Sequence, residues 1–175
     1  QAKVGHKDYA FLLHDALFRS YLIQDRFQDA AKVAHAYTEN YLYDFHAYKM
    51  ALNEIKSYKT GKFEIQEWKA KEHLVASLGL HSDYWKQLTE DQQSVIRPIL
   101  VSHLLELAHL YYVKMQAAYD QVSLAGNSAN QTSYHALAKQ SAEYYLSLVE
   151  TRGENRLNGG SLYLAAEALY KAGNF

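Results

Sequence analysis

The sequence contains no cysteine and a single proline, Pro98. The absence of cysteine excludes disulfide bonds, thiol nucleophiles and cysteine-ligated metals. Glycine is also scarce, with 8 residues in a chain of 175. Proline and glycine are the residues that most often interrupt helices, so their scarcity favours long, uninterrupted helical segments.

The sequence also lacks a surplus of charge and a long apolar run. Its 18 basic and 19 acidic side chains leave a formal net charge of −1, whereas a protein that binds nucleic acid needs a surplus of positive charge to neutralise phosphates. No segment approaches the length of about 18 consecutive apolar residues that a membrane-spanning helix requires. We therefore expect neither a nucleic-acid partner nor a membrane span.

The residues that are abundant favour helix almost throughout. Strand signals are nearly absent, and apolar residues recur at the three- and four-residue spacing of one helical face. Two series illustrate this spacing, and we expect each to form a buried face: Leu13, Leu17 and Tyr21, and then Ala30, Ala34, Tyr37 and Tyr41.

We expect one all-α domain spanning residues 1–175, because this length and the 49% apolar content suit a single hydrophobic core. The second of the expected helices exceeds the usual helix length, so a break within it is also open. The expected helices cover residues 7–24, 27–58, 63–79, 90–124, 133–151 and 160–172.

Local chemistry marks several helix boundaries. Asp25 lies where a tight turn fits between two helices, and Gly61 is expected to supply an unusual backbone angle at the next break. Thr89 and Gln92 match a capping box at the start of a helix. Pro98 follows, and either kinks that helix or marks the end of a short first helix.

The two ends of the chain predict a fragment of a longer polypeptide. Gln1 stands where a methionine would begin a complete chain, and Phe175 ends the chain where a further helix would begin after Gly173. The compartment stays open between the periplasm or the cell exterior and the cytoplasm.

Residues 16–34 resemble a tetratricopeptide repeat, a helical hairpin of two antiparallel helices. Leu17, Tyr21, Phe27 and Ala30 match the repeat's characteristic positions. Phe18 departs from the pattern, because the family has a small residue there so that two helices can approach closely. The residue four positions after Ala30 departs as well, being alanine rather than aromatic.

Two further segments resemble parts of the same repeat. Ala166 and the segment 173–175 are similar to the small position and the turn of another repeat, with Leu169 in place of the tyrosine, and residues 61–63 are a poorer echo. The resemblance implies antiparallel hairpins stacked as a right-handed solenoid, and a scaffold that binds a protein or peptide partner in a groove. Helical periodicity by itself is also compatible with an up-down helix bundle.

Tyrosine is unusually frequent: 16 tyrosines contribute to an aromatic content of 14%. Large aromatics most often fill gaps between helices, but tyrosine also suits binding surfaces. The adjacent tyrosines 111–112 and 144–145 lie about 100° apart on a helix, so each pair must face two environments. Lysines nearby would favour an acidic or carboxylate-bearing ligand. The candidate binding residues are Tyr37, Tyr41, Tyr48, Lys49, Lys56, Tyr112 and Tyr145.

The alternative is a helical-bundle metal protein or enzyme. Glu106 and His109 have the Glu-x-x-His spacing that places two metal ligands on one helix face, but no second such motif occurs. His35 and Glu39 are also one helical turn apart, for which an ordinary surface pair is the default. No nucleophile elbow, Walker loop or dinucleotide-binding glycine motif is present. We predict no catalytic residues and no cofactor, and the oligomeric state stays open.

Overall fold

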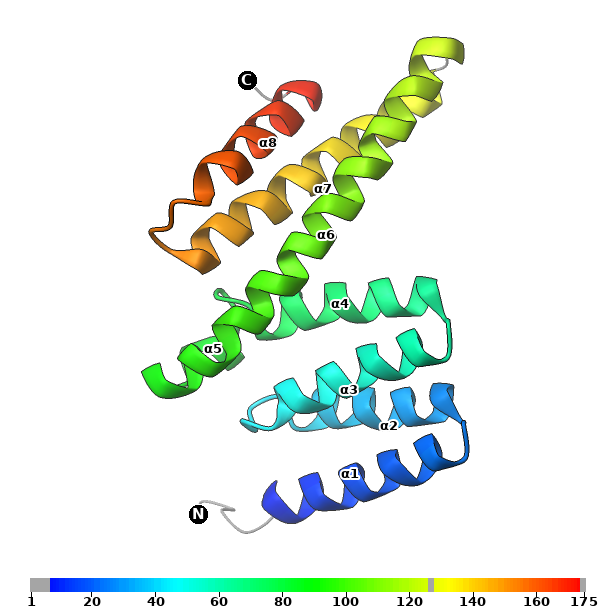
Figure 1. The fold of residues 1–175 in the computed structure, drawn as a ribbon, viewed down its shortest axis with the longest axis vertical. Coiled ribbons are helices and arrows are strands. Elements are labelled where there is room, and N and C mark those ends of the chain that lie inside the picture. The colour runs from blue at the N-terminus through cyan, green and yellow to red at the C-terminus, as the bar shows by residue number, and fades with distance from the viewer. Residues whose placement is uncertain (1–6, 126–127, 174–175) are drawn as a thin grey trace. The chain divides into compact units, whose positions relative to one another are not determined.

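A computed structural model describes residues 7–125 and 128–173, and every regular element in these ranges is an α-helix (Figure 1). The prediction of an all-α protein is therefore confirmed. None of the described helices combines the length and the apolar character that crossing a membrane requires. The helices are α1 (Lys7–Ile23), α2 (Phe27–Asn40), α3 (Ala47–Thr60), α4 (Glu64–Leu78), α5 (Asp83–Lys86), α6 (Glu90–Ala125), α7 (Ser128–Arg152) and α8 (Asn158–Lys171).

The long helix expected at 27–58 is broken into α2 and α3. The break is stabilised by Asp44, whose buried Oδ1 accepts a hydrogen bond from the backbone N–H of His46 at 2.7 Å and lies 3.0 Å from Nδ1 of the same histidine. A side chain that bonds nearby backbone in this way competes with the helical hydrogen bonds. The sequence did not predict α5, which begins where the Ser82 hydroxyl accepts a bond from the Trp85 N–H at 3.1 Å.

The chain divides into two compact units, a first unit of Gln1–Ile96 and a second unit of Arg97–Phe175. The boundary falls within α6, next to Pro98. The helix continues through Pro98, so the alternative of a short helix ending before the proline is wrong. Whether the two units act as one domain stays a prediction.

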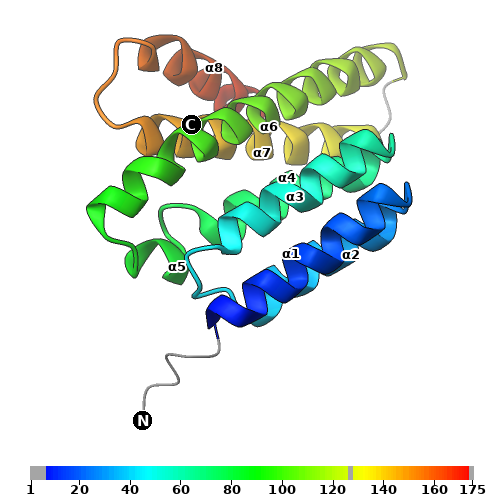
Figure 2. The ribbon, with the colours of Figure 1, turned by 60° about the horizontal axis from the view of Figure 1, so that its bottom comes forward.

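The first unit packs α1 on α2, α2 on α3 and α3 on α4, in chain order (Figures 1 and 2). Its core contains the fully buried Ala30, Ala34 and Tyr37 of α2 together with Met50 of α3. Alanine at a helix crossing lets two backbones approach closely, and the large side chains fill the space beside the crossing. The buried face expected for α2 is thus confirmed, with Tyr41 half-buried at its end.

The buried face expected for α1 is wrong for Leu13 and Leu17, whereas Tyr21 is half-buried and packs against the core as expected. Leu13 and Leu17 are 55% and 44% exposed, whereas Phe18 is only 4% exposed. As the first helix of the unit, α1 packs against α2, and the narrow stripe that it buries runs through Ala10 and Phe18. Phe18 therefore fills the core at the position where the tetratricopeptide pattern has a small residue.

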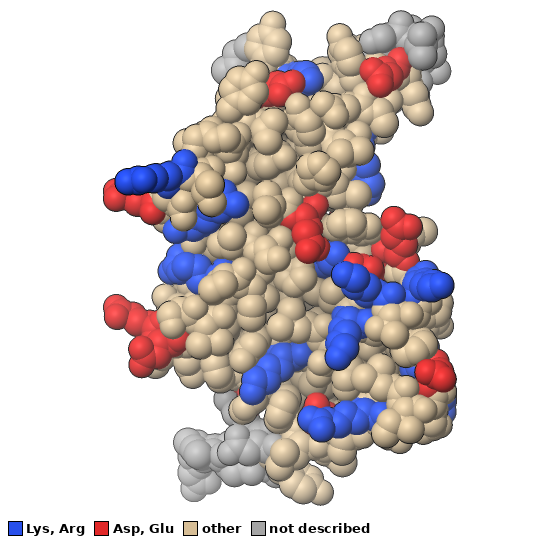
Figure 3. All heavy atoms as spheres, in the orientation of Figure 1, with Lys and Arg blue, Asp and Glu red and all other residues tan. Residues whose placement is uncertain are grey.

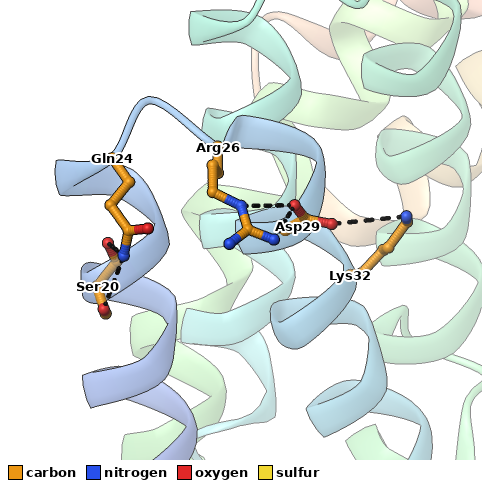
Figure 4. Close-up of polar contacts among 5 residues, drawn as sticks. All are labelled: Ser20, Gln24, Arg26, Asp29 and Lys32. Atoms are coloured by element: carbon orange, nitrogen blue, oxygen red, sulfur yellow. Dashed lines mark hydrogen bonds and ion pairs between the residues drawn. The ribbon is translucent and has the colours of Figure 1, made fainter.

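The turn between α1 and α2 is a tight one, as expected, with Asp25 in the left-handed region at φ 53°. Just after it, the guanidinium of Arg26 binds Asp29 (Nε to Oδ2, 2.9 Å), while Gln24 donates to the Ser20 carbonyl at 3.0 Å (Figure 4). The hydrogen bond from Arg26 lowers the pKa of Asp29 below its ordinary value. The contact of Gln24 stabilises the end of α1, and the contact of Arg26 stabilises the start of α2.

The capping box at the start of α6 is confirmed. The backbone N–H of Thr89 donates to Gln92 Oε1 at 3.0 Å, and the N–H of Gln92 donates to Thr89 Oγ1 at 3.3 Å. Two N–H groups that the helix leaves unbonded are thereby satisfied. At the other end of the chain, α8 stops before Gly173, which adopts φ 74° as expected of a helix-terminating glycine.

Gly61 has a different role from the one expected. Its φ is −76°, and the unusual angle belongs to Lys62 at 60°. A Cβ atom on Gly61 would lie 2.5 Å from the Phe63 ring and 2.9 Å from the Cβ of Phe27. Glycine is required there because α2 and the start of α4 leave no room for a side chain.

We expect Gly61→Ala to destabilise the protein by about 1–3 kcal/mol, the usual range for forcing an extra carbon into a packed site. The Phe63 ring could rotate away, but Phe27 Cβ is fixed to its backbone. Gly159→Ala is the matched control, since a Cβ there meets no atom within 4 Å and alanine favours helix. Urea denaturation measures the free energy of unfolding of both variants. Equal free energies of unfolding for Gly61→Ala and Gly159→Ala would contradict this account.

Candidate functional site

The second unit contains a pocket of about 600 Å³ formed by α6, α7, α8 and the loop that joins α7 to α8. This volume lies within the range of ligand-binding pockets in proteins. The residues that line it are Leu105, Glu106, His109, Tyr145, Arg152, Leu157, Gly160, Ser161 and Leu164.

The apolar part of the pocket is partly open to solvent. Leu157 is 68% exposed and Leu105 is 44% exposed, while Tyr145 is buried. Gly160 keeps one wall free of a side chain, and a Cβ added there would meet no atom within 4 Å. When a ligand covers exposed leucines beside a cavity, the burial of their apolar surface makes the free energy of binding more favourable.

The polar part of the pocket is centred on Arg152, the last residue of α7. Its Nη1 donates to the Ser161 hydroxyl at 3.1 Å. In the described ranges, Arg152 forms no ion pair with a carboxylate. A guanidinium has five N–H donors in a fixed plane, so most of its donors stay available for an acceptor on a ligand. The pocket therefore offers a cation beside an apolar surface.

Glu106 and His109, the alternative metal ligands, both line this pocket. Glu106 Oε2 lies 3.8 Å from His103 Nδ1 on the same helix. For residues 7–125 and 128–173, the group of three side chains with metal-ligand geometry belongs to the first unit and contains neither Glu106 nor His109. The other polar groups lining the pocket are Arg152 and the hydroxyls of Tyr145 and Ser161, and a guanidinium repels a cation. The pocket lining thus carries one guanidinium, Arg152, and one carboxylate, Glu106, and in the described ranges it holds no group of three side chains with metal-ligand geometry.

The adjacent tyrosines of α6 both contact α7. Tyr111 lies 5.4 Å from Tyr144 and Tyr112 lies 6.3 Å from Tyr145, measured between ring centroids. Burial raises the pKa of Tyr145, which lines the pocket. Both rings of each pair thus contact the same neighbouring helix, so these contacts do not confirm the expectation that each pair faces two environments.

Tyr112 also reaches α8, where its hydroxyl donates to Glu167 Oε2 at 2.8 Å. The Lys171 ammonium binds the other oxygen of this carboxylate at 2.7 Å. These two hydrogen bonds, from Lys171 first and Tyr112 second, lower the pKa of Glu167. Burial and the bond to Glu167 raise the pKa of Tyr112. The three residues form a polar link between α6 and α8.

The other candidate binding residues lie in the first unit. Tyr37 is completely buried and therefore belongs to the core, and the half-buried Tyr41 stacks on it at 4.9 Å. Tyr48 is half-buried, with the exposed Lys49 ammonium 5.9 Å from its ring. Lys56 is exposed on α3. Because Tyr112 and Tyr145 belong to the second unit, the seven residues do not form one site within either unit.

Sequence reasoning missed Arg152, Leu157 and Ser161, which it placed in or beside a loop. The available signal was an apolar residue, Leu157, followed closely by two glycines between two helices. A leucine in a polar connecting segment has no apolar neighbours within that segment to pack against. It therefore points to a surface contact.

Comparison with known proteins finds no matching family model, no matching curated protein and no matching solved structure.

Positive and negative side chains are interspersed on the face shown in Figure 3, with uncharged surface between them. This mixture agrees with the formal net charge of −1.

The Tyr112–Glu167–Lys171 link predicts a pH-dependent contribution to stability. The pKa of Glu167 is lowered from its ordinary 4.5 in the folded protein, so its stabilising effect is fully present above that value and is lost as the pH falls through the folded pKa. We expect Glu167→Gln to cost about 0.5–1 kcal/mol at neutral pH, as a partly exposed charged hydrogen bond does.

Urea denaturation at neutral pH and at pH ~3 measures the difference in free energy of unfolding between Glu167→Gln and the original protein. This difference should be smaller at the lower pH. Glu143→Gln is the matched control, because Glu143 is exposed on α7 and its oxygen lies 3.9 Å from Lys139. A loss from Glu167→Gln that is the same at both pH values would contradict the role given to the carboxylate charge.

Proposed function

We propose that the protein is a non-enzymatic binding module that holds a peptide segment of a partner protein in the pocket between α6, α7 and α8. The observation that carries this proposal is the position of the Arg152 guanidinium, which has no carboxylate partner in the described ranges, beside exposed leucines in a pocket of about 600 Å³. The partner segment would combine an apolar side chain with a neighbouring acidic group.

The two parts of the pocket make separate contributions to binding. Full burial of a leucine side chain contributes about 1.5–3 kcal/mol, and Leu157 and Leu105 both have exposed surface to lose. A carboxylate against Arg152 forms two parallel N–H···O bonds, which fix the orientation of the ligand. The apolar contacts thus supply affinity, and the arginine selects for an acidic group.

A peptide suits this pocket better than a small enclosed solute. Leu157 lies in the connection before α8 and is 68% exposed, so a ligand must extend over the rim to cover it. An extended peptide can place one side chain in the pocket and continue across the rim. Small ligands, by contrast, are mostly buried within the pockets that bind them.

We further propose that the helices form a stacked-hairpin solenoid resembling tetratricopeptide repeats, rather than an up-down bundle. The first unit supports this arrangement, since each helix from α1 to α4 packs against the next one in the chain. The residues Leu17, Tyr21, Phe27 and Ala30 support it independently through the repeat pattern. Families of stacked helical repeats commonly serve as scaffolds for partner proteins.

Selection of short random peptides on the immobilised protein tests the proposed function. We expect the enriched peptides to carry an acidic residue next to a large apolar one. Fluorescence anisotropy with a selected peptide should show binding weakened about tenfold by Arg152→Gln, the loss expected for one charge-assisted hydrogen bond. Leu157→Glu should weaken binding at least as much, because it places a like charge beside the acidic ligand.

Leu162→Glu is the matched control. Leu162 is an exposed leucine of α8 that does not line the pocket, so this variant should bind the peptide within about twofold of the original protein. The proposal fails if selected peptides bind the Arg152 and Leu157 variants as tightly as the original protein. It also fails if no peptide is enriched on the original protein relative to a variant that carries both Arg152→Gln and Leu157→Glu.

A further inference from the structure

Three helices of the first unit bring two histidines and a glutamate together. His35 lies on α2, Glu54 on α3 and His73 on α4, and one potential ligand atom of each lies within 4.8 Å of the others. His35 Nδ1 is 3.2 Å from Glu54 Oε2, and the two imidazole rings have centroids 5.0 Å apart. The sequence separates these residues widely, so only the packing of the three helices assembles the cluster.

Glu54 is the buried member of the cluster, with a side chain that is only 7% exposed. Within the described ranges, His35 is its single hydrogen-bond partner. A carboxylate withdrawn from water is costly unless cations or several donors compensate its charge. One imidazole at 3.2 Å leaves most of that requirement unmet, and a bound cation would meet it.

His73 is oriented by a second carboxylate. Its Nε2 lies 2.9 Å from Glu39 Oε1, whereas its Nδ1 is buried and has no hydrogen-bond partner among the described residues. Histidines that bind metals usually donate their other ring N–H to a carboxylate, which fixes the ring and its tautomer. His73 shows this arrangement, with Nδ1 left for a metal.

We propose that His35, Glu54 and His73 form a binding site for a zinc ion, with Glu39 as the residue that orients His73. Zinc bonds to nitrogen and carboxylate oxygen are about 2.0–2.2 Å long, so two ligand atoms on a tetrahedral ion lie about 3.3 Å apart. The separation of 3.2 Å between His35 and Glu54 already meets this requirement. The His73 ligand atom lies within 4.8 Å of the other two, and rotation of the side chains about their single bonds is required to bring it to the distance that a tetrahedral ion sets.

The donor set selects zinc over the common oxygen-binding cations. Two imidazole nitrogens and one carboxylate suit zinc and its first-row neighbours, whereas magnesium and calcium prefer sites made of oxygen ligands. His35 keeps 45% of its side chain exposed, so the ion has a path from solvent. Binding would also join α2, α3 and α4 through one centre and thereby stabilise the first unit.

Isothermal titration of the chelator-treated protein with zinc chloride tests this site. We expect one zinc ion per chain, and a visible absorption band when cobalt replaces zinc. His35→Gln and His73→Gln should each weaken zinc binding by more than about 100-fold, and Glu39→Gln by about 10- to 100-fold, as loss of an orienting carboxylate does. The melting temperature of the original protein should rise with zinc concentration.

His81→Gln is the matched control, because it removes an exposed imidazole of the same unit from outside the cluster. Circular dichroism should confirm that all variants fold, which is expected since glutamine replaces half-buried or exposed side chains. The proposal is overturned if the His35→Gln/His73→Gln double variant binds zinc as tightly as the original protein, or if zinc leaves the melting temperature of the original protein unchanged.

Discussion

The close approach of neighbouring helices at alanine is the constraint on which the rest of this structure depends. In α2, Ala30, Ala31 and Ala34 are completely buried, and in α7 Ala138 and Ala142 are as well. A helix pair can approach this closely only where both backbones meet without large side chains between them. The large aromatic residues are then accommodated beside the crossings, as Tyr37 in the first unit shows. Tyr37 thus fills space beside the buried alanines of α2.

The same packing decides where polar chemistry can occur. Where the helices meet closely, a polar side chain can find its partner on the adjacent helix, as His35 does with Glu54. Where the first turn of α8 has Gly160 in place of a larger residue, space stays open and a pocket forms beside Arg152. The His35–Glu54–His73 cluster and the pocket thus have opposite physical origins. One results from dense packing around polar groups, and the other from the local absence of side chains.

The sequence predicts the helices well because their signals are local. The capping box of Thr89 and Gln92 and the turn at Asp25 depend on residues a few positions apart, and both are confirmed. The orientation of α1 was missed because it is set by which neighbour the helix packs against, and Leu17 and Phe18 are both apolar enough to be buried. The pocket was missed for the same reason: Arg152 and Leu105 are 47 positions apart (152 minus 105) and meet only in the folded chain.

The pair His35 and Glu39 shows most clearly why spacing along one helix is a weak guide to a site. The two residues are one turn apart on α2, and the ordinary expectation is a surface pair worth about 0.2–0.5 kcal/mol. In the structure each contacts a different helix: His35 contacts Glu54 of α3, and Glu39 contacts His73 of α4. For His35 the partner on another helix prevails because the Glu54 carboxylate is buried and has lost its water, so a contact with it is worth more than one made in solvent. Glu39 is 56% exposed, so burial of the carboxylate does not explain its contact with His73. Tertiary packing, which spacing along one helix does not reveal, supplies the partner in both cases.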